Sequence, residues 1–244
     1  MPLSNMRQPR PQPSDVGAVP SRDMSVRNVP FLLNASPTKP NSFVDRILWN
    51  FAGYFRRKRF SGFNQLLSGI DSIIDFGGTP SIWLSIGRDN VVLLNIDEQQ
   101  VPSGFVAIRG DARKTDFPDY SFDFSFSNST IEHVGTWEDQ QAFAQELCRV
   151  GKRVYCQTPA RCFFLEPHYF TPFVHWFPFL LRRHWFVRYF TYYGLKWKPS
   201  RDQVKDFQSR LRLLNYSEMQ RLFPNCTVRR ERFVGMTKAY IAIR

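Results

Sequence analysis

The stretch SIIDFGGTP, residues 72–80, decides the fold that the sequence predicts. Its apolar first half fits a short buried strand, and Asp75 stands near the carboxyl end of that strand. The pair Gly77-Gly78 predicts a tight turn, because glycine lets the backbone come close to a ligand. Ligands of open α/β sheets bind at the carboxyl edge of the strands. This stretch therefore marks a candidate binding edge.

Outward from this stretch, apolar runs that fit strands alternate with segments that fit helices. Four further runs fit buried strands and span 91–96, 105–108, 122–127 and 153–157. Helices are predicted over 80–87 and 137–150, and the chain closes with a predicted hairpin of 228–234 and 238–243. This pattern is typical of an α/β protein, with a Rossmann-like, seven-stranded, mostly parallel sheet, helices on both faces and a C-terminal antiparallel hairpin.

The net charge of +12 over 244 residues is unevenly distributed. Residues 71–150 hold five basic and 13 acidic side chains, a net −8, whereas 1–70 carry +7 and 151–244 carry +13. A uniformly basic nucleic-acid binder would not show this distribution. The acidic middle third thus lies between two basic flanks, and the basic flanks favour an anionic partner.

Cysteine spacing and hydropathy indicate in which cellular compartment the protein is expected. The four cysteines form no CxxC pair and no Cys/His cluster with zinc spacing, so we expect free thiols in a reducing cytoplasm and no metal site. The most apolar stretch, 169–181, has 13 residues and two prolines, whereas a bilayer span needs about 20 apolar residues. With no signal peptide recognisable, we expect a cytoplasmic protein, and peripheral contact with a membrane stays open.

Polar residues follow each of the next predicted strands. Asp97 comes 22 residues after Asp75, with Glu98 beside it, where a carboxylate can accept both hydroxyl protons of a ribose. Asp111-Ala112 follows the third strand, where a carboxylate can accept from the exocyclic amine of adenine. The fourth strand leads into Ser127-Asn128 and then Ile131-Glu132-His133.

Taken together, these signals resemble the class I S-adenosylmethionine-dependent methyltransferases, and in particular the type 11 group. The resemblance covers about residues 71–160 and implies S-adenosylmethionine as the cofactor. It implies cofactor contacts for the residues at the four strand ends, which are Asp75, Gly77, Gly78, Asp97, Glu98, Asp111, Ala112, Ser127 and Asn128. The usual first motif has glycine at alternate positions, and Thr79-Pro80 replaces part of it here. A nicotinamide enzyme is disfavoured, because its GxGxxG fingerprint is absent.

The predicted organisation has five segments. They are a disordered Pro-rich tail (1–41), a leading helical segment that Ser42 opens (42–70), the cofactor-binding core (71–160), a helical acceptor-side cap (161–225) and the closing strands (226–244). The tail holds eight of the 17 prolines.

The residues after the fourth strand limit the chemical class of the methyl acceptor. Asn128-Ser129-Thr130-Ile131 is not the Asn/Asp-Pro-Pro-aromatic motif of amino-methylating nucleic-acid enzymes, and Asn128 replaces the Asp of metal-dependent catechol-type enzymes. A small-molecule, glycan or lipid-linked acceptor remains. The alternatives are an RNA methyltransferase and a cofactor-binding domain without transfer activity.

Two histidines are candidate catalytic residues. His133 follows the exit of the fourth strand, and His168 lies in the sequence EPHY, 166–169. Imidazole titrates near neutral pH, so either side chain could act as a general base, or each could have a structural role.

The cap region is rich in both aromatic and basic residues. Between 161 and 200, Phe, Tyr and Trp interleave with arginines at 161, 182, 183 and 188. Three interpretations stay open: an apolar cap packed on the sheet, a surface that touches an anionic membrane, and an RNA-binding surface with stacking aromatics.

Overall fold

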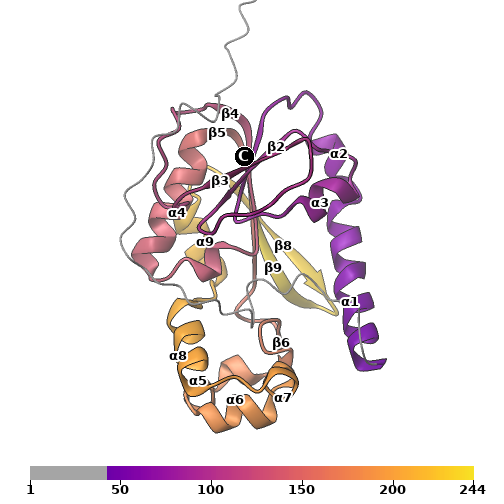
Figure 1. Ribbon diagram of the computed structural model, residues 1–244, viewed down its shortest axis with the longest axis vertical. Helices are drawn as coiled ribbons and strands as arrows, with labels where there is room; N and C mark the ends of the chain where they lie inside the picture. The colour runs from indigo at the N-terminus through magenta and orange to yellow at the C-terminus, as the bar shows by residue number, and fades with distance from the viewer. Residues whose placement is uncertain (1–42) are drawn as a thin grey trace, which may run out of the picture.

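The computed structural model describes residues 43–244, and both the predicted tail, 1–41, and the predicted helix start at Ser42 lie outside this part. A seven-stranded sheet with the order β3-β2-β1-β4-β5-β9-β8 forms the centre (Figure 1). Its strands are β1 (Ile73–Phe76), β2 (Val91–Asn95), β3 (Phe105–Arg109), β4 (Phe122–Asn128), β5 (Gly151–Pro159), β8 (Thr227–Phe233) and β9 (Met236–Ile243).

The first five strands are parallel, and β9 runs antiparallel to both β5 and β8. The predicted fold class is confirmed, including the closing hairpin. Each predicted strand is found within a few residues of its expected bounds, since a buried parallel strand is written as a short apolar run between polar or glycine residues.

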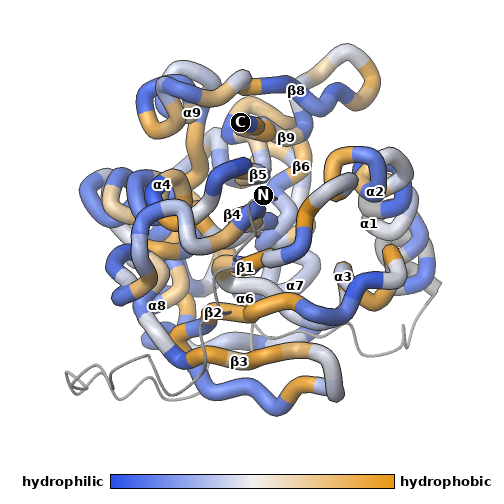
Figure 2. Tube along the Cα trace, turned by 90° about the horizontal axis from the view of Figure 1, so that it is seen from above, coloured by the Kyte–Doolittle hydropathy of each residue, from blue (hydrophilic) through white to orange (hydrophobic). Residues whose placement is uncertain are grey.

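Helices cover both faces of the sheet (Figure 2). On one face lie α1 (Phe43–Phe60), α2 (Phe63–Leu66) and α3 (Pro80–Ser85); on the other lie α4 (Trp137–Val150) and α9 (Tyr216–Leu222). Phe124 and Phe126 of β4 pack with Phe63 and Trp83 on the first face, and Ile74 and Phe76 of β1 pack with the α4 residues on the second. Alternate side chains of a strand point to opposite faces, so one strand serves both cores.

The helix α4 has the bounds that the sequence predicts. It begins with a capping box, in which the Thr136 hydroxyl accepts from the Asp139 amide and the Asp139 carboxylate accepts from the Thr136 amide. Phe143 and Leu147 of its apolar side are fully buried.

The region 161–210 forms a separate lobe beyond the carboxyl ends of the parallel strands (Figure 1). It contains a two-stranded sheet that the sequence does not predict, β6 (Leu165–Glu166) with β7 (Thr171–Pro172). The helical elements that follow are η3 (Val174–Trp176), α5 (Pro178–Leu181), α6 (His184–Phe190), α7 (Tyr192–Trp197) and α8 (Arg201–Arg210). Residues 216–222, assigned to the cap by sequence, form α9 and pack in the main core instead.

Among residues 43–244, no helix is long and apolar enough to span a bilayer.

Candidate functional site

The turn after β1 is built around two glycines. Gly77 has a φ of +78°, and a side chain at this position would overlap Thr130. A Cβ on Gly78 would overlap the carboxylate of Asp75. Both positions therefore require glycine, one for its backbone conformation and both for space. Bare backbone is consequently presented at the edge where the sequence predicts ligand binding.

Asp75 is fully buried in β1. Its Oδ2 accepts a 2.7 Å hydrogen bond from the indole nitrogen of Trp83 in α3, and its Oδ1 has no hydrogen-bond partner among the described residues. Burial raises the pKa of Asp75 to about 7, against the lowering effect of the Trp83 hydrogen bond. A buried carboxyl oxygen without a partner can accept a hydrogen bond from a cationic or polar ligand.

The next two strand ends present acidic residues in different states. Asp97 and Glu98 follow β2 and are exposed. Asp111 follows β3, with Ala112 half-buried beside it, and its carboxylate is ion-paired with Arg113 at 2.6 Å. Partial burial alone would raise the pKa of Asp111, but the hydrogen bonds and charge of Arg113 lower it.

Arg113 is a member of the site region that was not predicted from the sequence. Its guanidinium also pairs with Asp139 at 2.6 Å and so ties the β3 exit to the start of α4. A basic residue two positions after a candidate site acid was the signal that could have indicated this pairing.

At the end of β4 the two predicted residues make different contacts. Ser127 is buried and its hydroxyl donates to the Phe76 carbonyl oxygen at 3.2 Å, linking β4 to β1. The Asn128 side-chain oxygen accepts a 2.9 Å hydrogen bond from Arg59 at the end of α1. Arg59 also donates to both carboxylate oxygens of Glu231, at 2.7 and 3.2 Å. Arg59 of the basic run 56–59 is thus held in the interior of the site region.

A cavity of about 250 Å³ lies beside Asn128, between α1, the ends of β4 and β5, and the cap. Aromatic side chains of Phe55, Phe163 and Phe170 line it, together with Arg59 and Lys238. It has the mixture of apolar walls and few polar groups that small-molecule sites show.

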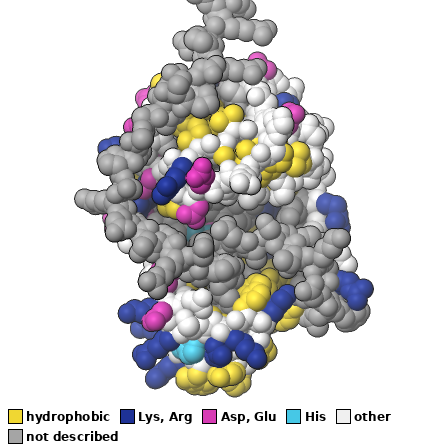
Figure 3. Space-filling model, in the orientation of Figure 1, with side chains coloured by type: hydrophobic (Ala, Val, Ile, Leu, Met, Phe, Trp, Pro, Cys, Tyr) yellow, Lys and Arg dark blue, Asp and Glu magenta, His cyan; other side chains and the backbone are white. Residues whose placement is uncertain are grey.

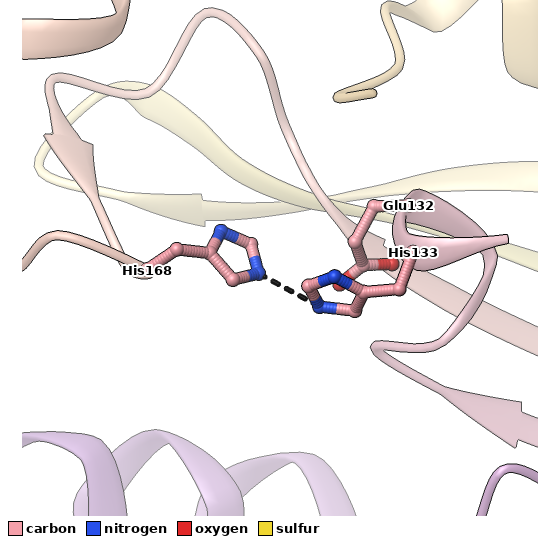
Figure 4. A group of neighbouring side chains, drawn as sticks. All are labelled: Glu132, His133 and His168. Carbon is pink, nitrogen blue, oxygen red and sulfur yellow. Dashed lines mark hydrogen bonds between the residues drawn. The ribbon is translucent and has the colours of Figure 1, made fainter. Parts of the chain in front are cut away.

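The two candidate histidines, 35 residues apart in sequence, meet beside this edge (Figure 4). His133 ends the turn η2 (Ile131–His133), and His168 lies between β6 and β7. Their Nε2 atoms are 3.0 Å apart. His168 Nδ1 lies 2.6 Å from Oε1 of the buried Glu166, whose Oε2 accepts from the Tyr169 amide.

The pKa values of the two rings move in opposite directions. Burial and the charge of His168 lower the pKa of His133 well below its usual value. Burial also opposes the charge on His168, but the neighbouring Glu166 carboxylate overcomes this and raises its pKa. A proton shared by the pair therefore resides on His168.

Glu132 is a further member of this group that the sequence analysis did not assign a role. It is fully buried, its Oε2 accepts from the Thr158 hydroxyl at 2.9 Å, and its Oε1 has no partner among the described residues. One ligand atom from each of Glu132, His133 and His168 lies within 4.8 Å of the others. The adjacent pair Glu132-His133, just after a predicted strand, was the signal in the sequence that could have indicated a role for Glu132.

The chain is similar to a methyltransferase family in sequence and to solved structures in fold. The sequence model of a family described as a methyltransferase domain matches residues 77–154. No curated protein sequence matches the chain. A solved structure from Pyrococcus horikoshii is similar, with a TM-score of 0.51, 15% identity, and coverage of 86% of this chain and 95% of that one.

The magnesium protoporphyrin IX methyltransferase of Synechocystis, solved with S-adenosylhomocysteine bound, is similar with a TM-score of 0.50. The two chains are 12% identical over 83% of this chain and 88% of that one. At such low sequence identities, these two structures support only the fold of the chain. The assignment of a methyltransferase domain comes from the family match over residues 77–154.

Proposed function

Since the chain is a class I S-adenosylmethionine-dependent methyltransferase, we propose that it methylates a small-molecule, glycan or lipid-linked acceptor held between its sheet edge and its cap. The observation that carries the proposal is the cavity beside Asn128, which opens where the predicted cofactor edge meets the cap. The cofactor supplies an electrophilic methyl group on a sulfonium.

The residues at the sheet edge fit this cofactor. The Gly77-Gly78 turn packs so closely against Thr130 and Asp75 that neither position has room for a Cβ, so the turn presents only backbone to a ligand. The Asp75 oxygen that has no partner among the described residues is a buried acceptor for a cationic group. We assign Asp97 and Glu98 to the ribose hydroxyls, and Asp111 with Ala112 to the adenine. Ser127 and Asn128 would lie beside the methionine part, with the Asn128 amide nitrogen free to donate while its oxygen accepts from Arg59.

Holding the two reactants in line is the main contribution proposed for the chain. Methyl transfer from a sulfonium is a displacement that depends on close, aligned approach of the acceptor. The aromatic walls of the cavity, including Phe55 and Phe163, would bind an apolar part of the acceptor, and Arg59 and Lys238 would face an anionic or polar part. His133 and His168 are the candidates to act on the acceptor atom.

The outer surface of the cap supports a lipid-linked acceptor. Nine of the 15 exposed large apolar side chains among the described residues lie in 173–197. They are Phe173, Trp176, Phe177, Phe179, Trp185, Tyr189, Phe190, Leu195 and Trp197. Figure 3 shows hydrophobic side chains at the lower end of the molecule with Lys and Arg around them. No acidic residue occurs between Glu166 and Asp202 in the sequence.

Such a surface fits an anionic membrane. Exposed aromatic groups can enter the headgroup region, and neighbouring cations are attracted to acidic lipids by about 1 kcal/mol each. The methyltransferase would then work at the membrane surface, with its acceptor cavity reached from the lipid side.

An RNA acceptor is the second candidate. A groove of about 650 Å³ between α1, α2 and the β8–β9 hairpin is lined by several cations, including Lys58, Arg153, Arg229 and Arg230. Arginines lining a groove suit phosphates. The groove shares Phe55 and Arg59 with the cavity beside Asn128, but none of the predicted cofactor residues lines it, so the RNA acceptor ranks below the lipid-linked one.

The deciding experiment uses the purified full chain with labelled S-adenosylmethionine. Calorimetry should detect cofactor binding, and incubation with separate lipid, polar small-molecule and RNA fractions of a cell extract should place the label in the lipid or small-molecule fraction. Label in RNA alone would replace the proposed acceptor class. Absence of cofactor binding would remove the proposal altogether.

A further inference from the structure

Two buried carboxyl groups, those of Glu132 and Glu166, lie beside the paired rings of His133 and His168. Glu132 and Glu166 are 0% and 1% exposed, and both approach the same pair of imidazole rings. The rings can carry little more than one positive charge between them, because two imidazolium groups 3.0 Å apart would repel strongly. When both are ionised, the two buried carboxylates face at most one positive charge, and burial accordingly raises the pKa of Glu132.

Among the described residues, hydrogen bonds leave two buried polar atoms of this group without partners. Oε1 of Glu132 and Nδ1 of His133 are both buried and have no partner among the described residues. The Thr158 hydroxyl satisfies one oxygen of Glu132, whereas both oxygens of Glu166 have partners, which are the Tyr169 amide and His168 Nδ1. The unused Glu132 oxygen and the two ring nitrogens that face each other belong to three side chains that come close together.

We propose that Glu132, His133 and His168 bind one divalent transition-metal ion. Two imidazoles and a carboxylate form a ligand set that suits ions of the Mn²⁺ to Zn²⁺ series, rather than the all-oxygen sites of Mg²⁺ or Ca²⁺. Two ligands about 2.1 Å from one ion are about 3.0 Å apart at the right angles of an octahedral site and about 3.4 Å apart in a tetrahedral one, so the 3.0 Å between the Nε2 atoms favours the octahedral ions of this series. A charge of +2 balances the two buried carboxylates.

Glu166 has the position of an outer-shell partner. It lies 2.6 Å from His168 Nδ1 and accepts its proton, so it leaves Nε2 as the ligand atom. Metal-binding histidines regularly donate their second nitrogen to a carboxylate in this manner. The Tyr169 amide and the surrounding β6–β7 turn hold Glu166 in place.

The ion would act on the acceptor, and this role rests on the methyl transfer proposed above. Ser129 and Pro167, close in sequence to His133 and His168, line the acceptor cavity, whereas none of the three ligands does, so an acceptor oxygen would have to pass this lining to reach the ion. With three protein ligands, coordination positions remain for an acceptor oxygen, whose hydroxyl pKa the ion would lower. The proton leaves to solvent, the oxygen bonds to the methyl carbon, and the carbon–sulfur bond breaks with its electron pair left on sulfur.

Metal binding can be measured apart from transfer. The full chain, stripped with EDTA and dialysed, is titrated with Mn²⁺, Co²⁺ and Zn²⁺ by calorimetry, and Co²⁺ binding is followed by its visible absorption. We expect one equivalent to bind with ligand-field bands. His168→Ala and Glu132→Gln should lose this site, and Glu166→Gln should weaken it by about 10- to 100-fold. His184→Ala is the matched control, because His184 bonds the Pro199 carbonyl in the cap.

Failure of stoichiometric binding by the unmodified chain would overturn the proposal, whatever the variants do. Equal affinity in the chain and in a folded His168→Ala variant would do the same. Circular dichroism identifies variants that do not fold, and His168→Asn replaces His168→Ala in that event. Calorimetry with S-adenosylmethionine on the same samples separates this outcome from failure of the proposed function.

Discussion

The indole nitrogen of Trp83 in α3 donates a 2.7 Å hydrogen bond to Oδ2 of Asp75 in β1, and both side chains are fully buried. This pairing joins the first strand to the helix that follows the glycine turn. The other carboxyl oxygen of Asp75, Oδ1, has no hydrogen-bond partner among the described residues and can accept from a ligand. Trp83 thus fixes the orientation of the acid that the sequence identifies as the first cofactor residue.

Asp75→Asn should change the pH dependence of stability. The carboxyl pKa is about 7 in the folded chain and 3.8 in the unfolded chain, so the folded state favours the protonated acid. That stabilisation is complete below pH 3.8 and is lost as pH rises through about 7. The variant should therefore resemble the wild type at low pH and exceed its free energy of unfolding by up to about 4 kcal/mol at alkaline pH.

Urea unfolding of both proteins across this pH range measures the difference. A difference that does not grow with pH would show that Asp75 titrates normally. In the same variant at pH 8, above the Asp75 pKa of about 7, S-adenosylmethionine should bind about tenfold more weakly or worse, because a charged carboxylate is replaced by a neutral amide.

Gly78→Ala should remove cofactor binding and lower stability. The new Cβ would overlap the buried Asp75 carboxylate, so the turn must move, at a cost of about 1–3 kcal/mol. Gly62→Ala is the control, since its φ is −108° and nothing lies within 4 Å of its added Cβ. The control should stay within about 0.5 kcal/mol of the wild type. Calorimetry and thermal unfolding give both quantities, and a Gly78→Ala protein with unchanged affinity would contradict the assigned close approach.

Arg59→Gln should loosen α1 from the sheet. Arg59 is the only residue for which bonds to both Glu231 and Asn128 are observed in the described chain, and its side chain is 10% exposed. Losing these charged hydrogen bonds should lower the free energy of unfolding by about 2 kcal/mol. Arg57→Gln, on the exposed side of the same helix, should have little effect. A double-mutant cycle with Glu231→Gln should give a coupling above about 0.5 kcal/mol, and additive effects would count against the pairing.

The aromatic surface of the cap should bind anionic vesicles. In flotation at low salt, the full chain should float with phosphatidylserine–phosphatidylcholine vesicles and less with phosphatidylcholine alone. Trp185→Ser with Phe190→Ser, which are 53% and 60% exposed, should reduce flotation. Tyr120→Ser, 55% exposed just before β4, should not. Equal flotation of all three proteins, or recovery of the chain only with RNA, would reject the membrane role.

Most of the sheet could be predicted from sequence because its determinants are local. The runs that became β1 and β2 are short and apolar, with glycine or acidic residues close to their ends, as is typical of a strand buried on both faces. The capping residues Thr136 and Asp139 fix the start of α4 within one turn. The β6–β7 pair was missed, because two-residue strands carry no periodicity.

The candidate site was only partly open to prediction. Residue types at strand ends located Asp75, Asp97 and Asp111, since parallel strands bring their carboxyl ends to one edge. Sequence could not tell that Asp97 would be exposed while Asp111 would be ion-paired with Arg113. Those states depend on which side chains from other segments pack nearby.

By itself, then, the sequence determined the order of strands and helices, the glycine turn after β1 and the family that the chain resembles. Each of these depends on residues within a few positions of one another, as Gly78 and Asp75 show. The tertiary structure decided which distant residues act together. It placed His168 against His133 across 35 positions and Arg59 against Glu231 across 172. Such contacts follow from how the cap and α1 fold back onto the sheet edge, and no spacing along the chain encodes them.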